Sequence, residues 1–231
     1  MINLGRAIEH PFQDRDWAVK VLIGAGVSLV PVLNFAMQGY ALTVLRNTAR
    51  GEDTPLPRWD ALGKLFMDGL ILFLVNLIYA IPVLVLVGGL MFLGLGFGVA
   101  TNDMAKSTRD TLGTGFAVVG AGVGCLAALY GLLLAVIMPA VHMQVAGTGK
   151  IGPAFHPHEI LALMKRNPGD YFVVVALPLA VGLIVGMGYG IVSIVPFVGI
   201  CLTFMLVPVF VLVSPYIQIV LAHLYGQLLK G

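Results

Sequence analysis

Two histidines stand inside long apolar runs of this 231-residue sequence, where an imidazole has little polar company. His142 and His223 both lie close to the polar segment that follows their run. Imidazoles that face each other from two helices can ligate haem or a chlorin. The sequence therefore suggests His142 and His223 as cofactor ligands, with an interfacial hydrogen-bonding role for each ring as the alternative.

A second group of side chains has a composition suited to a divalent metal. His156, His158 and Glu159 stand close together in a polar segment, and Glu9 and His10 are candidates for the same face. Imidazole nitrogens and carboxylate oxygens are ordinary metal ligands. No second paired motif completes a set of four ligands, so a solvated loop is the alternative interpretation.

Small residues recur at intervals of four in two apolar runs. Such rows let helix backbones approach closely, which matters in lipid, where apolar side chains gain little by leaving their surroundings. We expect them to pack within the chain or to face a partner or a second copy. The rows are Gly182, Gly186 and Gly190, and Gly120 and Gly124 followed by Ala128.

The composition indicates the surroundings in which these residues lie. Hydrophobic residues make up 59% of the chain, and only 13 Lys and Arg and 11 Asp and Glu are present. An ordinary soluble domain carries roughly 25% charged residues. The chain is therefore predicted to be a membrane protein, which excludes soluble enzymes, nucleic-acid binders and disordered proteins.

Charged residues are absent from three long stretches of the sequence. Positions 70–100, 111–145 and 171–229 contain no Asp, Glu, Lys or Arg. Proton relays, ion-coupled transport and intramembrane hydrolysis usually need ionisable groups at depth. The sequence therefore favours a non-enzymatic protein, while movement of an uncharged or amphiphilic substrate stays open.

Five apolar stretches are long enough to cross a membrane. The first, residues 17–45, is either one helix kinked at Pro31 or a hairpin of two short helices. A hairpin places 11 of the 13 basic residues on one side and 2 on the other, whereas a single crossing places 5 and 8. Because basic residues concentrate in cytoplasmic loops, the hairpin is favoured, with both termini cytoplasmic.

The predicted fold is an all-α, polytopic transmembrane helical bundle of six membrane segments in a single domain, residues 1–231. The first hairpin is short enough to be re-entrant, since each arm has 14 residues. The predicted parts are an N-terminal interfacial segment 1–16, the hairpin 17–45, a cytoplasmic loop 46–68, helices 69–100 and 113–146, a cytoplasmic loop 147–170, and a second hairpin 171–229 that turns at Pro196.

Three polar segments repeat apolar residues at helical spacing. They are residues 4–12, 59–66 and 160–164, each with basic residues interspersed or close by. Such a pattern is typical of amphipathic helices that lie in the membrane interface. In the six-segment arrangement all three lie on the cytoplasmic face, and short connectors that merely end the spans are the alternative.

Several short motifs in the first third of the chain carry a family resemblance. They are His10-Pro11-Phe12-Gln13-Asp14-Arg15-Asp16-Trp17, Gly39-Tyr40-Ala41-Leu42, Arg46, Ala49-Arg50-Gly51-Glu52, Leu56-Pro57, Trp59-Asp60, Leu65-Phe66 and Asp68-Gly69. With these motifs the sequence resembles domain of unknown function 4013, an uncharacterised prokaryotic integral-membrane family. More distantly it is similar to the membrane domain of some glycerophosphodiester phosphodiesterases, although no catalytic domain is present. The resemblance implies a polytopic protein of the cytoplasmic (inner) membrane and supplies no activity or site residues.

Together these features predict a non-enzymatic, multi-pass structural or accessory subunit of a larger membrane assembly. Its expected partners are membrane lipids and either another membrane protein or a second copy of the chain, with no nucleic acid. Two other functions compete with this one. The first is binding or transport of a lipid or amphiphile, and the second is a haem- or chlorin-binding subunit that uses His142 and His223.

Overall fold

The computed structural model describes residues 2–52, 56–102, 104–193 and 196–230, without the side chains of 189, 191–193 and 196–205. Every element in that part of the chain is a helix. The residues form two compact units: unit 1 is Met1–Val75 with Met138–Gly231, and unit 2 is Asn76–Ile137. Two long helices, α4 (Leu62–Ala100) and α5 (Lys106–Thr148), contribute residues to both units.

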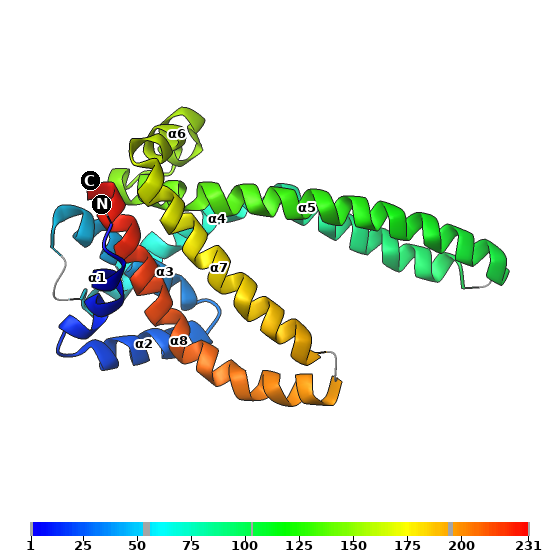
Figure 1. Ribbon diagram of the computed structural model, residues 1–231, viewed down its shortest axis with the longest axis horizontal. Coiled ribbons are helices and arrows are strands. Elements are labelled where there is room, and N and C mark those ends of the chain that lie inside the picture. Colours follow the sequence, from blue (N-terminus) through cyan, green and yellow to red (C-terminus); the bar gives the residue numbers. More distant parts are fainter. Residues whose placement is uncertain (1, 53–55, 103, 194–195, 231) are drawn as a thin grey trace. The chain divides into compact units, whose positions relative to one another are not determined.

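Unit 1 is organised around its last helix, α8 (Pro196–Lys230) (Figure 1). It contacts the N-terminal elements, the hairpin that follows them and α7. The other elements of unit 1 are α1 (Leu4–Glu9), η1 (His10–Gln13), α2 (Trp17–Leu29), α3 (Asn34–Arg50), η2 (Trp59–Ala61), η3 (Gly152–Phe155), α6 (Pro157–Arg166) and α7 (Pro168–Ser193).

The core of unit 1 lies largely between α3 and α8. At Gly226 these helices come so close that an added Cβ would lie 2.5 Å from the Cβ of Thr48. A glycine is needed there because any side chain would push the helices apart. Large side chains are fully or almost fully buried on both sides of this contact: Met37, Tyr40, Leu42 and Leu45 from α3, and Ile219 and Leu224 from α8.

The first apolar stretch forms two helices that pack against each other. Helix α2 ends at Leu29, and α3 begins at Asn34 after a turn that contains Pro31. The structure therefore has the predicted helix–turn–helix in place of one kinked helix. The second arm, however, continues to Arg50, five residues beyond the predicted end at Leu45.

The predicted loops are shorter because the helices extend into them. Helix α3 ends at Arg50 and is capped by Gly51, whose φ of +84° is a left-handed conformation and whose N–H bonds to carbonyls of the last turn. Helix α4 starts at Leu62, so most of the predicted interfacial segment 59–66 is its first turn. Helix α5 starts at Lys106, seven residues before the predicted position 113. The predicted start was Gly113, but a single glycine costs a helix only about 1 kcal/mol, which is too little to end the helix there.

The other two predicted interfacial segments do form short helices. Residues 4–12 become α1 and the start of η1, and residues 160–164 lie inside α6. Helix α6 is amphipathic, with Ile160 buried and the neighbouring Leu161 exposed. Their position at a membrane surface stays a prediction.

Unit 2 is a hairpin made of the distal parts of α4 and α5, which run antiparallel (Figure 1). The phenol of Tyr130 donates a hydrogen bond to the carbonyl of Tyr79 at 2.8 Å. Nearer the turn, the rings of Phe97 and Phe116 stack at 5.4 Å between centroids. These contacts tie one arm to the other at two levels.

Four helices of the described part are long and apolar enough to cross a membrane: Trp59–Ala100, Lys106–Thr148, Pro168–Gly188 and Leu206–Lys230. Helix α4 has 39 residues and α5 has 43. At 1.5 Å per residue they are about 58 and 64 Å long, well beyond a hydrocarbon core of roughly 30 Å. The six-segment arrangement stays a prediction, and its turn before Pro196 falls on residues 194–195, outside the described part.

Candidate functional site

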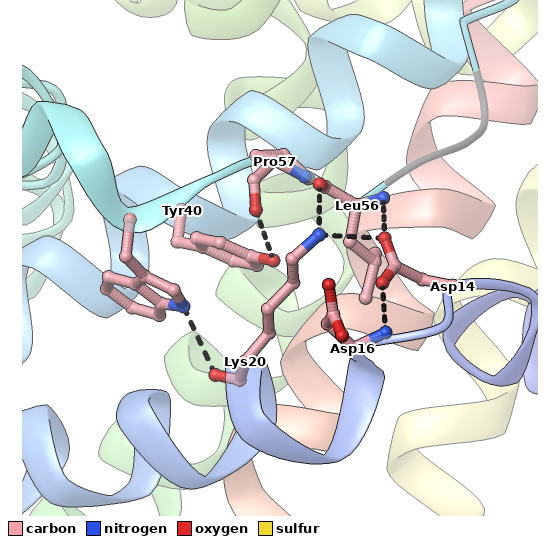
Figure 2. Close-up of polar contacts among 7 residues, drawn as sticks. Asp14, Asp16, Lys20, Tyr40, Leu56 and Pro57 are labelled. Carbon is pink, nitrogen blue, oxygen red and sulfur yellow. Dashed lines mark hydrogen bonds and ion pairs between the residues drawn. The ribbon is translucent and has the colours of Figure 1, made fainter.

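A strongly connected polar cluster of unit 1 surrounds the carboxylate of Asp14 (Figure 2). Its Oδ2 accepts hydrogen bonds from Lys20 Nζ and from the backbone N–H of Leu56, both at 2.7 Å. Its Oδ1 accepts from the N–H of Asp16 at 2.8 Å. Lys20 Nζ also donates to the carbonyl of Leu56 at 2.8 Å. We name this cluster, with Tyr40, Pro57 and Trp59, the Asp14 clasp.

Local structure explains why these groups meet. Asp14 and Asp16 belong to the turn that leads into α2, and Lys20 lies one turn inside that helix. Leu56 belongs to the connection between α3 and η2, far along the chain but folded back onto α2. The clasp therefore joins the N-terminal segment to a loop 42 residues away.

The clasp also sets the ionisation of Asp14. Burial by itself would raise the pKa of this carboxyl group. Hydrogen bonds from Lys20 and from the amides of Asp16 and Leu56, together with the positive charge of Lys20, outweigh burial and hold the pKa below its usual value. Asp14 is thus ionised, and both of its carboxylate oxygens already accept hydrogen bonds within the clasp.

Two aromatic residues close the clasp from α3 and η2. The ring of Tyr40 stacks on the ring of Trp59, with centroids 4.5 Å apart and planes 11° apart. The Tyr40 hydroxyl donates to the carbonyl of Pro57 at 3.0 Å, and Trp59 Nε1 donates to the carbonyl of Lys20 at 3.1 Å. Each polar tip thus fixes a backbone carbonyl while the rings exclude water.

A second ion pair joins three helices of unit 1. The guanidinium of Arg46 on α3 lies 2.6 Å from the Asp68 carboxylate on α4. Its Nε donates to the carbonyl of Ala146 on α5 at 3.2 Å. Both side chains are mostly buried, at 18% and 16% exposed. Arg46 therefore bridges the end of α3 to the polar ends of α4 and α5.

Beside this ion pair, α3 and α4 cross in backbone contact. A Cβ added to Gly39 would lie 1.8 Å from the carbonyl oxygen of Leu65, and one added to Gly69 would lie 1.6 Å from that of Phe35. No side chain fits at either position. The two glycines thus fix how closely α3 approaches α4.

The chain ends of unit 1 are also fastened together. Gln227 near the end of α8 accepts a hydrogen bond from the N–H of Asn3 at 2.6 Å and donates to its carbonyl at 3.2 Å. The N–H of Ile2 donates to Asp170 at the start of α7. Figure 1 shows the two termini side by side. The N-terminal segment therefore bridges the polar ends of α7 and α8.

The two predicted cofactor ligands lie against different neighbours. His223 is fully buried and its ring stacks on that of His10, with centroids 4.1 Å apart. His142 lies near Tyr225, with 6.3 Å between ring centroids. On α8, positions 223 and 225 are about 200° apart around the helix axis. Because His142 of α5 lies beside Tyr225, it is on the opposite side of α8 from the ring of His223. The structure therefore does not bring the two rings to one site, and cofactor ligation by either histidine stays a prediction.

Of the predicted metal ligands, the structure brings His156 and Glu159 together. His156 Nδ1 lies 3.1 Å from Glu159 Oε1, while the other oxygen of Glu159 accepts a hydrogen bond from Gln144. His156 precedes α6 and His158 lies within its first turn, two residues further on. Among the described residues, no group of three or more His, Cys, Asp or Glu side chains could hold a metal ion.

The predicted glycine rows lie at the surface of their units. A Cβ added to Gly124, Gly182, Gly186 or Gly190 would meet no heavy atom within 4 Å in the described structure, and one added to Gly120 would meet only Leu90 at 3.7 Å. Inside its own unit, Gly120 is thus the one glycine of these rows that has a side chain of another helix near its Cβ position in the described structure. Their use as a face for a partner or a second copy stays a prediction.

Sequence reasoning gave no role to the residues of the Asp14 clasp or to the crossing at Gly39 and Gly69. Most of them nevertheless lie in the motifs that carried the family resemblance. One available signal was Lys20, a charged residue three positions inside an apolar stretch. A cation there requires a nearby anion, and two carboxylates precede it.

The helical architecture and the four apolar helices indicate a membrane protein. Residues 23–195 match a family described as protein of unknown function, DUF4013. The chain belongs to this family. Searches of curated proteins and of solved structures find no match. The more distant similarity to glycerophosphodiester phosphodiesterases stays a prediction.

Proposed function

We propose that this chain is a non-enzymatic, multi-pass accessory subunit of an assembly in the cytoplasmic membrane. In this proposal six segments enter the membrane and both termini face the cytoplasm. Its support is that the polar contacts of Asn3, Arg46 and Asp170 hold the ends of several helices together in unit 1. Most basic residues of the chain lie in the polar segments that this arrangement places on the cytoplasmic face, in agreement with the positive-inside rule.

The observation that carries the accessory role is the set of exposed glycine rows. In the most apolar window of α5 no residue is buried within the chain. Lipid covers exposed leucine and valine without cost, but a row of glycines offers lipid little and offers another helix a close approach. Gly120 and Gly124 on α5 and Gly182 and Gly186 on α7 therefore suit a partner helix.

Mild extraction of the tagged chain from its native membrane tests this function. We expect a membrane protein to co-purify in fixed stoichiometry. Gly124→Leu and Gly186→Leu should reduce the co-purified partner at least tenfold, because a large side chain blocks close approach. Gly122→Leu and Gly188→Leu are matched controls, since each lies two residues away on the same helix and also has open space at its Cβ.

Two results would contradict the proposal. One is a chain that purifies alone from its native membrane and binds a defined solute. The other is a partner whose amount is the same in all four variants. If a second copy of the chain is retained instead of another protein, the glycine rows form a homo-oligomer and the accessory role is lost.

The proposed topology has its own test. With Cys125 and Cys201 replaced by alanine, a single cysteine at Thr108 should react only with a reagent applied from outside the cytoplasmic membrane. A cysteine at Arg166 should react only from the cytoplasmic side. Labelling of Thr108→Cys from the cytoplasm would overturn the six-segment arrangement.

A further inference from the structure

Unit 2 contains an open, groove-like cavity between its two helices, close to their turn. Its volume is about 660 Å³, within the range of roughly 300–1,000 Å³ that ligand pockets occupy. The walls are almost entirely apolar, with Thr111 the one hydroxyl among the lining side chains. The principal walls are Leu90, Leu93 and Phe97 from α4, and Leu112, Phe116 and Val119 from α5.

A smaller hollow of about 290 Å³ adjoins this cavity at the turn end. Ser107 and Thr108 line it, and Thr111 and Leu112 line both spaces. Thr111 donates its hydroxyl to the carbonyl of Ser107 at 3.0 Å, which keeps the first turn of α5 closed on itself. The lining thus changes from mainly apolar side chains in the first space to hydroxyl-bearing ones in the second.

The hydroxyl-lined end coincides with the first turn of α5. The N–H of Arg109 makes a helical bond to the carbonyl of Ala105 at 3.0 Å, so the amides of residues 106–108 precede the hydrogen-bonded part of the helix. Lys106 and Arg109 are exposed here, together with the carboxylate of Asp110. A phosphate is the group that such amides, hydroxyls and cations hold together.

We propose that this cavity binds one phospholipid, with an acyl chain between α4 and α5 and its phosphate at the first turn of α5. The lining argues for this occupant, because the side chains between α4 and α5 are apolar, while Lys106 and Arg109 stand exposed at the hydroxyl-lined end, where their charge complements a phosphate. The proposal is independent of the accessory role.

Two glycines make the cavity testable. Gly96 and Gly115 line it from opposite helices, and a Cβ at either would meet no heavy atom within 4 Å. A leucine at either position therefore fills the space without displacing the backbone. Gly98 and Gly113 lie two residues away on the same helices, have equally open Cβ positions and do not line the cavity.

Native mass spectrometry of the full chain gives the first test. The probes are phosphatidylethanolamine and diacylglycerol with identical palmitoyl and oleoyl chains. We expect the wild type to retain one phosphatidylethanolamine at least tenfold more than diacylglycerol. Gly96→Leu and Gly115→Leu should lower that retention at least tenfold, and Gly98→Leu and Gly113→Leu should leave it within twofold. Circular dichroism of each variant verifies its helical content.

A second test needs no substitution. Phosphatidylethanolamine that carries a photoreactive diazirine in one acyl chain is added to the wild-type chain and activated by light. We expect crosslinks to concentrate in residues 90–100 and 111–119. Crosslinks spread evenly over all apolar helices would overturn the proposal.

Three results of the first test would also overturn it. Equal retention of the two lipids would show that the phosphate does not contribute to binding. Equal retention by all four glycine variants would show that the acyl chain does not occupy the cavity. A dimer that Gly96→Leu or Gly115→Leu dissociates shows that a second copy fills the groove in place of lipid.

Discussion

The two units of this protein are held together in different ways. In unit 1, buried polar groups join segments far apart in the sequence, and Asp14 and Tyr40 are at most 5% exposed. In unit 2, two antiparallel helices leave large apolar side chains uncovered, and Phe92 and Val99 are 77% and 80% exposed. The comparison separates positions where a contact fixes the fold from positions that lipid or a ligand can cover.

The physical reason lies in the surroundings. Lipid tails are as apolar as leucine, so burying a leucine between helices gains little. A hydrogen bond or a glycine crossing, in contrast, has one geometry in which it works. We therefore expect stability to depend on the clasp and the crossing of unit 1 far more than on the exposed apolar side chains of unit 2.

The largest effect is expected at the crossing of α3 and α4. Gly39→Ala places a methyl group 1.8 Å from the carbonyl oxygen of Leu65, which the helices can relieve only by separating. We expect a loss of at least about 3 kcal/mol in the free energy of unfolding. Denaturation by SDS in mixed micelles measures it. Gly63→Ala, in open space on α4, should be neutral or slightly stabilising.

The second effect concerns the Asp14 clasp. Asp14→Ala removes the anion beside the Lys20 ammonium, which keeps only the carbonyl of Leu56, and leaves the amide of Leu56 without its acceptor. We expect a loss of about 2 kcal/mol in the same SDS titration, in the range of hydrogen bonds to charged groups. Asp16→Ala should change stability by less than about 0.5 kcal/mol, since only its backbone takes part. Equal losses in the two variants would show that the clasp has no special weight.

Acid should weaken the same clasp. The pKa of Asp14 is lower in the folded chain than its unfolded value of about 3.9, so the folded state keeps the carboxylate ionised further into acid. Its contribution is complete above the unfolded pKa and is lost as pH falls through the folded pKa. We expect the melting temperature of the wild type to fall relative to that of Asp14→Asn below about pH 4. Parallel curves from pH 6 to pH 3 would contradict this.

The predictable parts of the fold were those that depend on local composition. Apolar length identified the four long helices, and the proline at position 31 marked the turn between α2 and α3. Helix ends were harder, because Arg46 and Thr48 are polar yet lie inside α3, where Asp68 and the contact at Gly226 hold them. A hydropathy pattern contains no information on such tertiary partners.

The site predictions had a similar limit. Sequence spacing placed His142 and His223 at comparable depths. It could not show that His142 of α5 and the ring of His223 lie on opposite sides of α8. The clasp was missed because its hydrogen-bonded partners are separated by up to 42 residues and three of them, Asp16, Leu56 and Pro57, take part only through backbone atoms. Backbone acceptors such as the carbonyl of Pro57 leave no mark on residue type.

A smaller loss is expected for a single hydrogen bond of the clasp. Tyr40→Phe removes the bond to the Pro57 carbonyl but keeps the stack on Trp59. We expect a loss of about 1 kcal/mol in the SDS titration. Tyr40→Ala, which removes ring and hydroxyl together, should cost about 3 kcal/mol or more. If Tyr40→Phe were as damaging as Tyr40→Ala, the hydroxyl and not the ring would be the main contribution.

The smallest effect tests the comparison most directly, because it uses one substitution in both units. Leu95 of unit 2 is 74% exposed and Leu45 of unit 1 is 2% exposed. Leu95→Ala should change the free energy of unfolding by less than about 0.5 kcal/mol, whereas Leu45→Ala leaves a cavity and should cost about 2–5 kcal/mol. Leu95 does not line the proposed lipid cavity, so lipid retention should also be unchanged. A large loss at Leu95 would mean that an unseen helix packs on unit 2, which favours the accessory role.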